Sequence, residues 1–84
     1  MRLQELLVDI EVLRIVGDTS TEVTDIQFDS RRAGEGCLFV AQEGTAADGH
    51  VYIEQCVAKG AVAIVLEKEE YIKDDGVCYI LVKN

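Results

Sequence analysis

Apolar residues recur along this chain in two patterns, one typical of a helix and the other typical of strands. Near the start, apolar side chains recur at i, i+3, i+4 and i+7, which predicts one face of a short amphipathic helix at Leu3, Leu6, Leu7 and Ile10. The apolar stretches that follow are short and are bounded by glycine or polar residues, which predicts strands at residues 12–16, 23–28, 37–41, 61–66 and 77–82.

The middle of the chain predicts a strand–helix–strand unit. Residues 37–41 and 61–66 are apolar at every position, which is typical of strands buried on both faces of a sheet. Between them, Asp48 is a suitable N-cap for a helix that begins near Gly49, and Gly60 is a suitable left-handed residue after its end. Its apolar face comprises Tyr52, Ile53, Cys56 and Val57. We therefore expect an α/β fold, a small and mostly parallel sheet with flanking helices that contains a right-handed βαβ unit.

Composition and charge argue against several classes of protein. A chain of 84 residues predicts one domain, and a hydrophobic fraction of 49% argues against disorder. No apolar run is long enough for a transmembrane helix, and acidic residues interrupt the first apolar stretch, which argues against a signal-peptide core. The net charge of −8 disfavours a nucleic-acid partner. We expect a cytoplasmic protein with neither a nucleic-acid nor a membrane partner.

Residue types that often carry catalysis are sparse. Cys37, Cys56 and Cys78 are odd in number, widely spaced and in apolar surroundings, which favours buried, reduced thiols over a disulfide or metal site. His50 is the only histidine and is interpreted as a packing or hydrogen-bonding residue rather than a base. No lysine is followed by serine or threonine, so the chain lacks that phosphate-binding loop motif. We therefore predict no catalytic residue, no metal and no cofactor in this chain alone.

Two polar loops follow the carboxyl ends of predicted strands, where ligands bind in open α/β sheets. The first, residues 29–32, offers the hydroxyl of Ser30 and two guanidinium groups. The second, residues 44–50, is rich in small residues that let a ligand approach the backbone, and it leads into a helix N-terminus that favours an anion. The two loops together suit a phosphorylated, hydrogen-bonding small molecule, and two ordinary surface loops are the alternative.

The same loops carry a family resemblance. Residues 29–67, DSRRAGEGCLFVAQEGTAADGHVYIEQCVAKGAVAIVLE, resemble the amino-terminal domain of the Mur ligases of peptidoglycan synthesis. The shared motifs are Asp-Ser-Arg, a glycine-rich turn into Leu-Phe-Val-Ala, and Asp-Gly-His before an aromatic–isoleucine pair. The opening MRLQELL is similar as well. One departure is Cys37, where the family usually has aspartate before Leu-Phe.

The resemblance implies that residues 1–84 form the UDP-substrate-binding domain of a larger three-domain, ATP-dependent amide ligase. The other domains would bind ATP with Mg²⁺ and the incoming amino acid, so this domain alone is not expected to be catalytic. The implied substrate is UDP-N-acetylmuramoyl-L-Ala-D-Glu, to which meso-diaminopimelate or lysine is added as the third residue. Two alternatives are the members that add D-alanyl-D-alanine and a non-catalytic interaction module with an acidic face at residues 67–75.

The expected site residues fall in the two loops. The resemblance assigns contacts with the UDP moiety to Phe28, Ser30, Thr45, Ala46 and Ala47. Arg31 is added to this set because its guanidinium is able to hold the phosphates, although a nearby carboxylate is an equally good partner. Residues expected to shape the second loop are Gly44, Asp48, Gly49 and His50.

Overall fold

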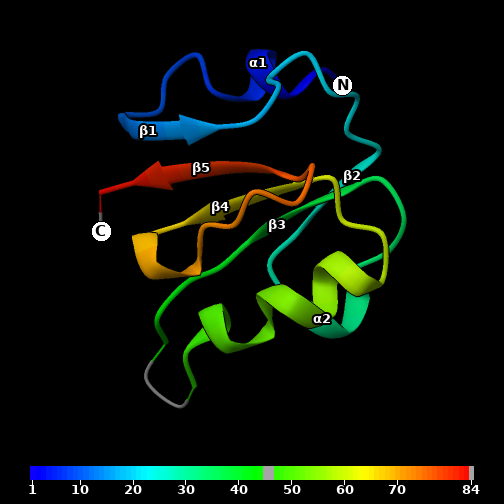
Figure 1. Cartoon of the computed structure of the whole chain (residues 1–84). Coiled ribbons are helices and arrows are strands. Elements are labelled where there is room, and N and C mark those ends of the chain that lie inside the picture. The colour runs from blue at the N-terminus through cyan, green and yellow to red at the C-terminus, as the bar shows by residue number, and fades with distance from the viewer. Residues whose placement is uncertain (45–46, 84) are drawn as a thin grey trace.

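The computed structural model describes residues 1–44 and 47–83, which build one five-stranded sheet with helices on both faces (Figure 1). The strands are β1 (Val12–Val16), β2 (Asp25–Gln27), β3 (Cys37–Val40), β4 (Ala63–Leu66) and β5 (Cys78–Val82). The helices are α1 (Leu3–Leu6) and α2 (Ile53–Ala58), with short 3₁₀ turns η1 (Ser30–Arg32), η2 (Gly49–Tyr52) and η3 (Glu69–Tyr71).

The sheet is mostly parallel, as predicted. The strand order is β1-β5-β4-β3-β2, and β2, β3, β4 and β5 run parallel to one another. Only the edge strand β1 is antiparallel, and it pairs with β5. The segment from β3 through η2 and α2 to β4 forms the expected βαβ unit, with β3 and β4 adjacent.

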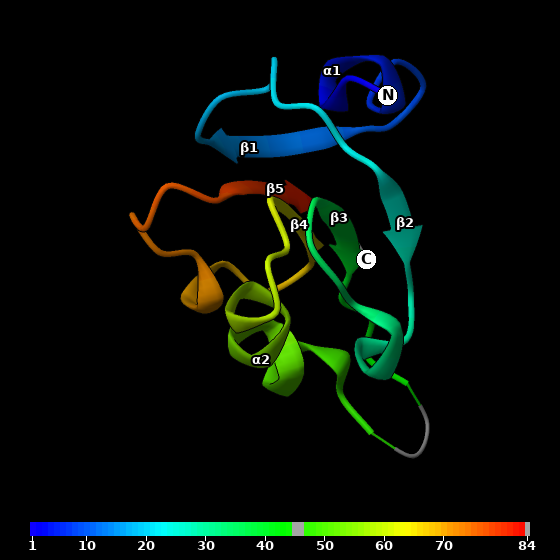
Figure 2. The same cartoon turned by 90° about the vertical axis from the view of Figure 1, so that its right-hand side faces the viewer.

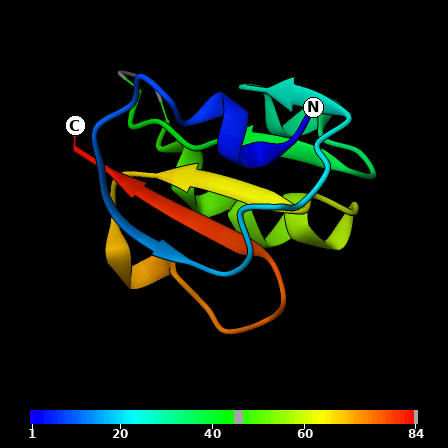
Figure 3. The ribbon, with the colours of Figure 1, turned by 90° about the horizontal axis from the view of Figure 1, so that it is seen from above.

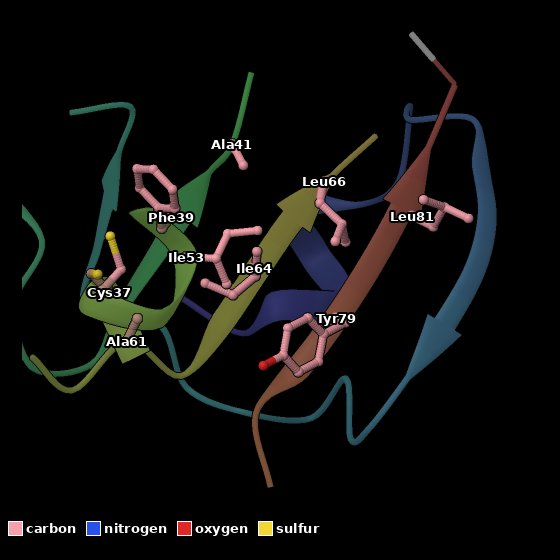
Figure 4. Close-up of a cluster of buried hydrophobic side chains, with 10 residues drawn as sticks. Cys37, Phe39, Ala41, Ile53, Ala61, Ile64, Leu66, Tyr79 and Leu81 are labelled. Carbon is pink, nitrogen blue, oxygen red and sulfur yellow. The ribbon is translucent and has the colours of Figure 1, made fainter. Parts of the chain in front are cut away.

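Side-chain alternation explains why the central strands are apolar at every position. On one face, Phe39, Ile64 and Tyr79 pack against α2, and this cluster is drawn in Figure 4. On the opposite face, Leu38 and Ile80 join the cluster that contains Leu3 of α1. Figure 3 shows α1 lying over that second face of the sheet. Because successive strand residues point to opposite faces, both sets must be apolar when helices cover both sides.

The first helix is shorter than the periodicity predicts. The α-helix covers only Leu3–Leu6, and the chain then continues through turns in which Leu7 N–H donates to Gln4 O and Ile10 N–H donates to Leu7 O. Arg2 at the N-cap provides no side-chain hydrogen bond, and so short a helix gains little from its own backbone bonds. Leu6, Leu7 and Ile10 nevertheless share one apolar surface, so the pattern identified the buried face but not the helix length.

The second helical segment begins where predicted but starts as a 3₁₀ turn. Asp48 is its N-cap, and η2 leads directly into α2. Gly60 follows the C-cap Lys59 with φ of +105°, the left-handed conformation expected after a helix end. The chain also passes close to Glu35 there, because a Cβ on Gly60 would lie 2.8 Å from the Glu35 Cα.

The strand predicted for residues 23–28 is also shorter in the structure. Regular pairing with β3 covers only Asp25–Gln27, because Val23 N–H donates to Met1 O and Thr24 N–H donates to Gly36 O. Phe28 therefore lies just beyond the end of β2, at the carboxyl edge of the sheet.

Candidate functional site

The two polar loops meet at the carboxyl edge of the sheet, as expected from their positions after β2 and β3. These strands are direct neighbours, so the turn after β2 lies beside the loop after β3. Between them is a pocket of about 300 Å³. Its lining comprises Phe28, Asp29, Ser30, Phe39, Gln42, Gly44, Ala47, Gly49 and Tyr52. Five of the ten predicted site residues therefore line one cavity.

The turn that carries Ser30 is held by Asp29. The Asp29 carboxylate accepts a hydrogen bond from Arg31 N–H at 2.9 Å, which caps the η1 turn. From the end of α2, the Lys59 ammonium donates to the Ser30 carbonyl oxygen at 3.0 Å, and η1 packs beside α2 (Figure 2). Because Asp29 is the cap of this turn, the Ser30 hydroxyl does not perform that role.

Arg31 does not line the pocket. Its guanidinium donates to both carboxylate oxygens of Asp29, at 3.1 and 2.9 Å, and its side chain is 88% exposed. These bonds hold the pKa of Asp29 well below its ordinary range, at about 2, chiefly through the Arg31 side chain. Of the two partners considered for Arg31, the structure provides the carboxylate.

Backbone hydrogen bonds frame the loop after β3. Gly44 N–H donates to Ala47 O at 2.9 Å, and Gly49 N–H donates to Gln42 O at 2.8 Å. A Cβ on Gly49 would lie 3.0 Å from the backbone nitrogen and oxygen of Gln42, so this close approach needs glycine. Thr45 and Ala46, both predicted ligand contacts, lie outside the described residues.

The amides at the start of the helix are not free, contrary to the premise of the predicted anion site. The three amides at this position already have acceptors, since Gly49 N–H donates to Gln42 O, His50 N–H to the Asp48 carboxylate, and Val51 N–H to Asp48 O. The Asp48 carboxylate also binds the Lys68 ammonium, and these bonds lower its pKa below the ordinary range, Lys68 having the largest effect. A side-chain anion of the protein therefore occupies the place expected for a ligand anion.

His50 is a buried hydrogen-bonding residue, as interpreted from the sequence. Its side chain is fully buried and lies against the Tyr71 ring, with the ring centroids 5.5 Å apart. Its Nδ1 is 2.7 Å from Asp48 Oδ1, and its Nε2 accepts from Glu67 N–H at 2.9 Å. His50 thus bonds residues on either side of the helical segment and is not among the residues that line the pocket.

Sequence reasoning missed four residues that line the pocket, namely Asp29, Phe39, Gln42 and Tyr52. Phe39 belongs to the core cluster as predicted, and both Phe39 and Tyr52 also line the cavity. Gln42 is predicted only as loop, although it lies two residues after the end of β3, at the edge where ligands are expected. Its position after the strand was the signal that would have identified it.

A second pocket, of about 310 Å³, lies on the face of the sheet covered by α1. It is almost wholly apolar and is lined by Leu6, Leu7, Ile10, Ile26, Phe28, Leu38, Val40, Gln42 and Val65. Phe28 and Gln42 line both pockets, so the two cavities adjoin at the carboxyl edge.

Within residues 1–44 and 47–83, no three His, Cys, Asp or Glu side chains are grouped so that they could hold a metal ion. In that same part of the chain, no helix has the length and apolar character needed to cross a membrane.

Comparison with known families shows the family to which this chain belongs. The family model described as "Mur ligase family, catalytic domain" matches residues 22–84. The chain belongs to the Mur ligase family. The resemblance of the loop motifs to the amino-terminal domain of the Mur ligases is thereby confirmed at the level of the family.

Curated relatives of this Mur ligase chain are named UDP-N-acetylmuramoyl-L-alanyl-D-glutamate–2,6-diaminopimelate ligases. Those of Parabacteroides distasonis and Bacteroides fragilis are 42% and 43% identical over the whole chain. The chain spans 17% of the length of each of these relatives.

Solved structures of the family have the same fold. A crystal structure of MurF from Acinetobacter baumannii matches 71% of this chain with a TM-score of 0.61 and 30% identity, and the match covers 13% of the MurF chain. A structure of the UDP-N-acetylmuramoylalanyl-D-glutamyl-2,6-diaminopimelate–D-alanyl-D-alanyl ligase from the same organism gives a TM-score of 0.60 at the same identity.

Proposed function

We propose that this chain is the amino-terminal domain of a cytoplasmic, ATP-dependent Mur ligase of peptidoglycan synthesis. In this role it holds the UDP end of UDP-N-acetylmuramoyl-L-Ala-D-Glu. The names of its relatives support this substrate, and the relatives from Parabacteroides distasonis, Bacteroides fragilis and Bacteroides thetaiotaomicron are all named as 2,6-diaminopimelate ligases. We therefore favour meso-diaminopimelate over lysine as the residue that the whole enzyme adds.

The pocket at the carboxyl edge carries the proposal. It combines the Ser30 hydroxyl, the Gln42 side chain and the backbone around Gly44 and Ala47 with the aromatic rings of Phe28, Phe39 and Tyr52. Hydroxyl, amide and backbone groups suit the polar edges of a base and a ribose. An exposed aromatic ring offers a face for stacking, and Phe28 is 62% exposed.

The chemistry of the pocket favours the nucleoside part of the substrate over its phosphates. The amides of Gly49, His50 and Val51 are already bonded within the chain, and Arg31 is paired with Asp29. The amides are not available for a diphosphate without breaking an existing bond, and Arg31 is not among the residues that line the pocket. We therefore propose that recognition by this domain rests mainly on the uracil and ribose.

ATP and Mg²⁺ belong in this proposal to the remaining domains of the same ligase. The sequence has no lysine followed by serine or threonine, and the described residues include no metal-binding group, so the residues of this chain do not fit either cofactor. We assign no step of the ligation to this chain. Selection of the incoming amino acid likewise falls to the other domains.

A second candidate is the amino-terminal domain of the ligase that adds D-alanyl-D-alanine. The structural similarity to MurF from Acinetobacter baumannii favours it, although at 30% identity compared with 42% for the diaminopimelate ligases. The expected nucleotide contacts are the same for both candidates.

Titration with uridine and UDP, followed through the amide signals of the chain, tests the proposal. We expect saturable shifts at Phe28, Ser30, Gly44, Ala47 and Gly49, and similar shifts with both ligands because the nucleoside dominates recognition. Adenosine diphosphate is the matched control and is expected to leave these signals unchanged. The absence of shifts at millimolar uridine and UDP would favour a non-catalytic interaction module instead.

A further inference from the structure

His50 connects the pocket loop to a distant segment of the chain. It is the one polar side chain that is fully buried among the described residues. It precedes α2 in sequence, yet its Nε2 accepts a hydrogen bond from the backbone of Glu67, which follows β4. The other ring nitrogen bonds Asp48, the residue that ends the pocket loop. One buried ring thus joins two segments that flank the helix.

The bond from Glu67 determines the protonation state that this arrangement requires. A backbone N–H can only donate, so Nε2 must be the unprotonated nitrogen. Nδ1 then carries the hydrogen and donates it to Asp48 Oδ1 at 2.7 Å. A second proton on the ring would place an N–H at Nε2 facing the Glu67 N–H, and this bond would be lost.

Lys68 reinforces the same connection. Its ammonium bonds the Asp48 carboxylate and lies 3.6 Å from a carboxylate oxygen of Glu43. Glu43 and Asp48 are bridge partners on the two sides of the pocket loop. The segment after β4 therefore holds both flanks of the loop, residues 42–44 and 47–49, where Gly44, Ala47 and Gly49 line the pocket.

We propose that His50 is a positioning residue for the nucleotide pocket, whose neutral ring, together with Lys68, holds the flanks of the loop in their binding arrangement. Gain of a second proton by the ring releases Glu67 and lowers the affinity for nucleotide. This inference rests on the proposed function, because it concerns the pocket assigned there to the uridine end of the substrate.

Charged groups face His50 on the side of Asp48. The ring faces the Asp48 carboxylate and the Tyr71 ring, with the Lys68 ammonium and the carboxylate of Glu43 beyond Asp48. Glu67 meets the ring through its backbone. A cationic ring would keep its bond to Asp48 Oδ1, and Lys68 bonds the other oxygen, Oδ2, so the bond lost on protonation is the one from Glu67.

The pH dependence of nucleotide affinity provides the main test. UDP-N-acetylglucosamine is the probe, because it lacks the terminal phosphate that would itself titrate near pH 6. From pH 8 to pH 5, the affinity of the folded chain is expected to fall with acid, because a second proton on the ring removes the bond from Glu67. The limit for one linked proton is a loss of about tenfold per pH unit.

Two sets of variants separate positioning from a purely structural role. His50→Gln keeps an acceptor for Glu67 N–H but cannot gain charge, so its affinity is expected to be nearly independent of pH over this range. Lys68→Met is expected to weaken the probe several-fold, and Lys68→Arg to restore part of that loss. The matched control is Lys73→Met, because Lys73 only pairs with Glu54 on the surface at 3.8 Å. It should bind the probe as the parent chain does.

Amide signals recorded without ligand test the positioning role of His50 separately from nucleotide binding. The amide signals of Gly44, Ala47, Gly49 and Glu67 are expected to shift together as the His50 ring titrates. Signals that do not follow the ring, or an equal pH dependence of affinity in His50→Gln, would overturn the inference. A loop that follows the ring in a chain that binds the probe at no pH would support the positioning role and overturn the proposed function.

Discussion

Ser30 and Arg31 are neighbours in the sequence, yet the fold gives them different surroundings. Ser30 lines the pocket, whereas Arg31 is paired with Asp29 and is not among the lining residues. Asp29 caps the turn through its own carboxylate, so neither neighbour is needed as the cap. A contribution of Ser30 to binding is therefore separable from a contribution to stability.

Replacing Ser30 with alanine is expected to weaken UDP binding and to leave the unfolding midpoint nearly unchanged. The loss should be about 0.5–1.5 kcal/mol, the usual net value of one neutral hydrogen bond. Calorimetric titration and thermal melts of the variant measure the two effects. Arg31→Ala is the control and should bind UDP with unchanged affinity. A Ser30→Ala chain that binds UDP as tightly as the parent would remove Ser30 from the site.

The carboxyl group of Asp29 is expected to titrate at a pH of about 2, well below its ordinary value of 3.8. The cause is the pair of hydrogen bonds from the Arg31 guanidinium, together with the bond from the Arg31 amide. Since this pKa is depressed in the folded state, the stabilising contribution is present above about pH 4 and is lost as the pH falls towards 2.

Carboxyl carbon shifts followed by NMR during acid titration measure this directly. Arg31→Ala should raise the Asp29 midpoint towards its ordinary value, because only the backbone bond remains. A midpoint near 3.8 in the parent chain would show that the Asp29–Arg31 pair does not persist in solution.

At the scale of elements, the end of α2 depends on a glycine that two constraints require. Gly60 has φ of +105°, and a side chain there would meet the backbone of Glu35 at 2.8 Å. Gly60 O also accepts the hydrogen bond from Gly36 N–H, so the helix end is joined to the turn before β3.

Gly60→Ala is expected to lower the free energy of unfolding by about 1–3 kcal/mol, because it adds a strained backbone conformation and a steric conflict. Gly34→Ala is the matched control, since a Cβ at Gly34 meets no atom within 4 Å. The control should change stability by less than about 0.5 kcal/mol. Urea unfolding measures the free energy of unfolding of both variants. Equal stabilities of Gly60→Ala and Gly34→Ala would contradict the conformation assigned to Gly60.

The sequence predicted elements where local pattern and burial agree. The fully apolar runs became β3 and β4, and the cap at Asp48 and the turn at Gly60 mark the limits of the helical segment. The pattern overestimated the length of the first helix. Periodicity indicates which side chains share a face, but it does not determine how many helical backbone hydrogen bonds form.

Contacts between distant parts of the chain were beyond sequence reasoning. Lys68 lies twenty residues after Asp48, and nothing local indicates that its ammonium would bind the cap of another element. The Asp48 carboxylate, which accepts from His50 N–H and binds that ammonium, already occupies the start of η2. The same holds for Tyr52, whose place in the pocket depends on how the helical segment lies against the loops after β2 and β3.

At the scale of the whole molecule, the three cysteines are divided between the two hydrophobic clusters, one on each face of the sheet. Cys37 and Cys56 belong to the cluster between the sheet and α2, and Cys78 belongs to the cluster on the α1 side. All three are free and buried. Burial raises the pKa of the Cys56 thiol to about 11 and also raises that of Cys78.

Thiol labelling of the native chain is expected to be slow at all three cysteines and fast in urea, because a buried, protonated thiol is a poor nucleophile. Mass spectrometry after timed labelling gives the rate at each position. Rapid labelling of Cys37 alone would show that the turn leading into β3 opens independently of the rest of the sheet.

The position of β5 within the sheet has a consequence for synthesis on the ribosome. This strand is the last in the sequence but lies between β1 and β4, so neither neighbour has its full set of partners until residues 78–82 have emerged. After β4 is made, residues 67–82 require roughly 1–3 s at ordinary elongation rates. During that interval the edge of β4 that faces β5 has no partner, and β1 remains unpaired although it was made among the first residues.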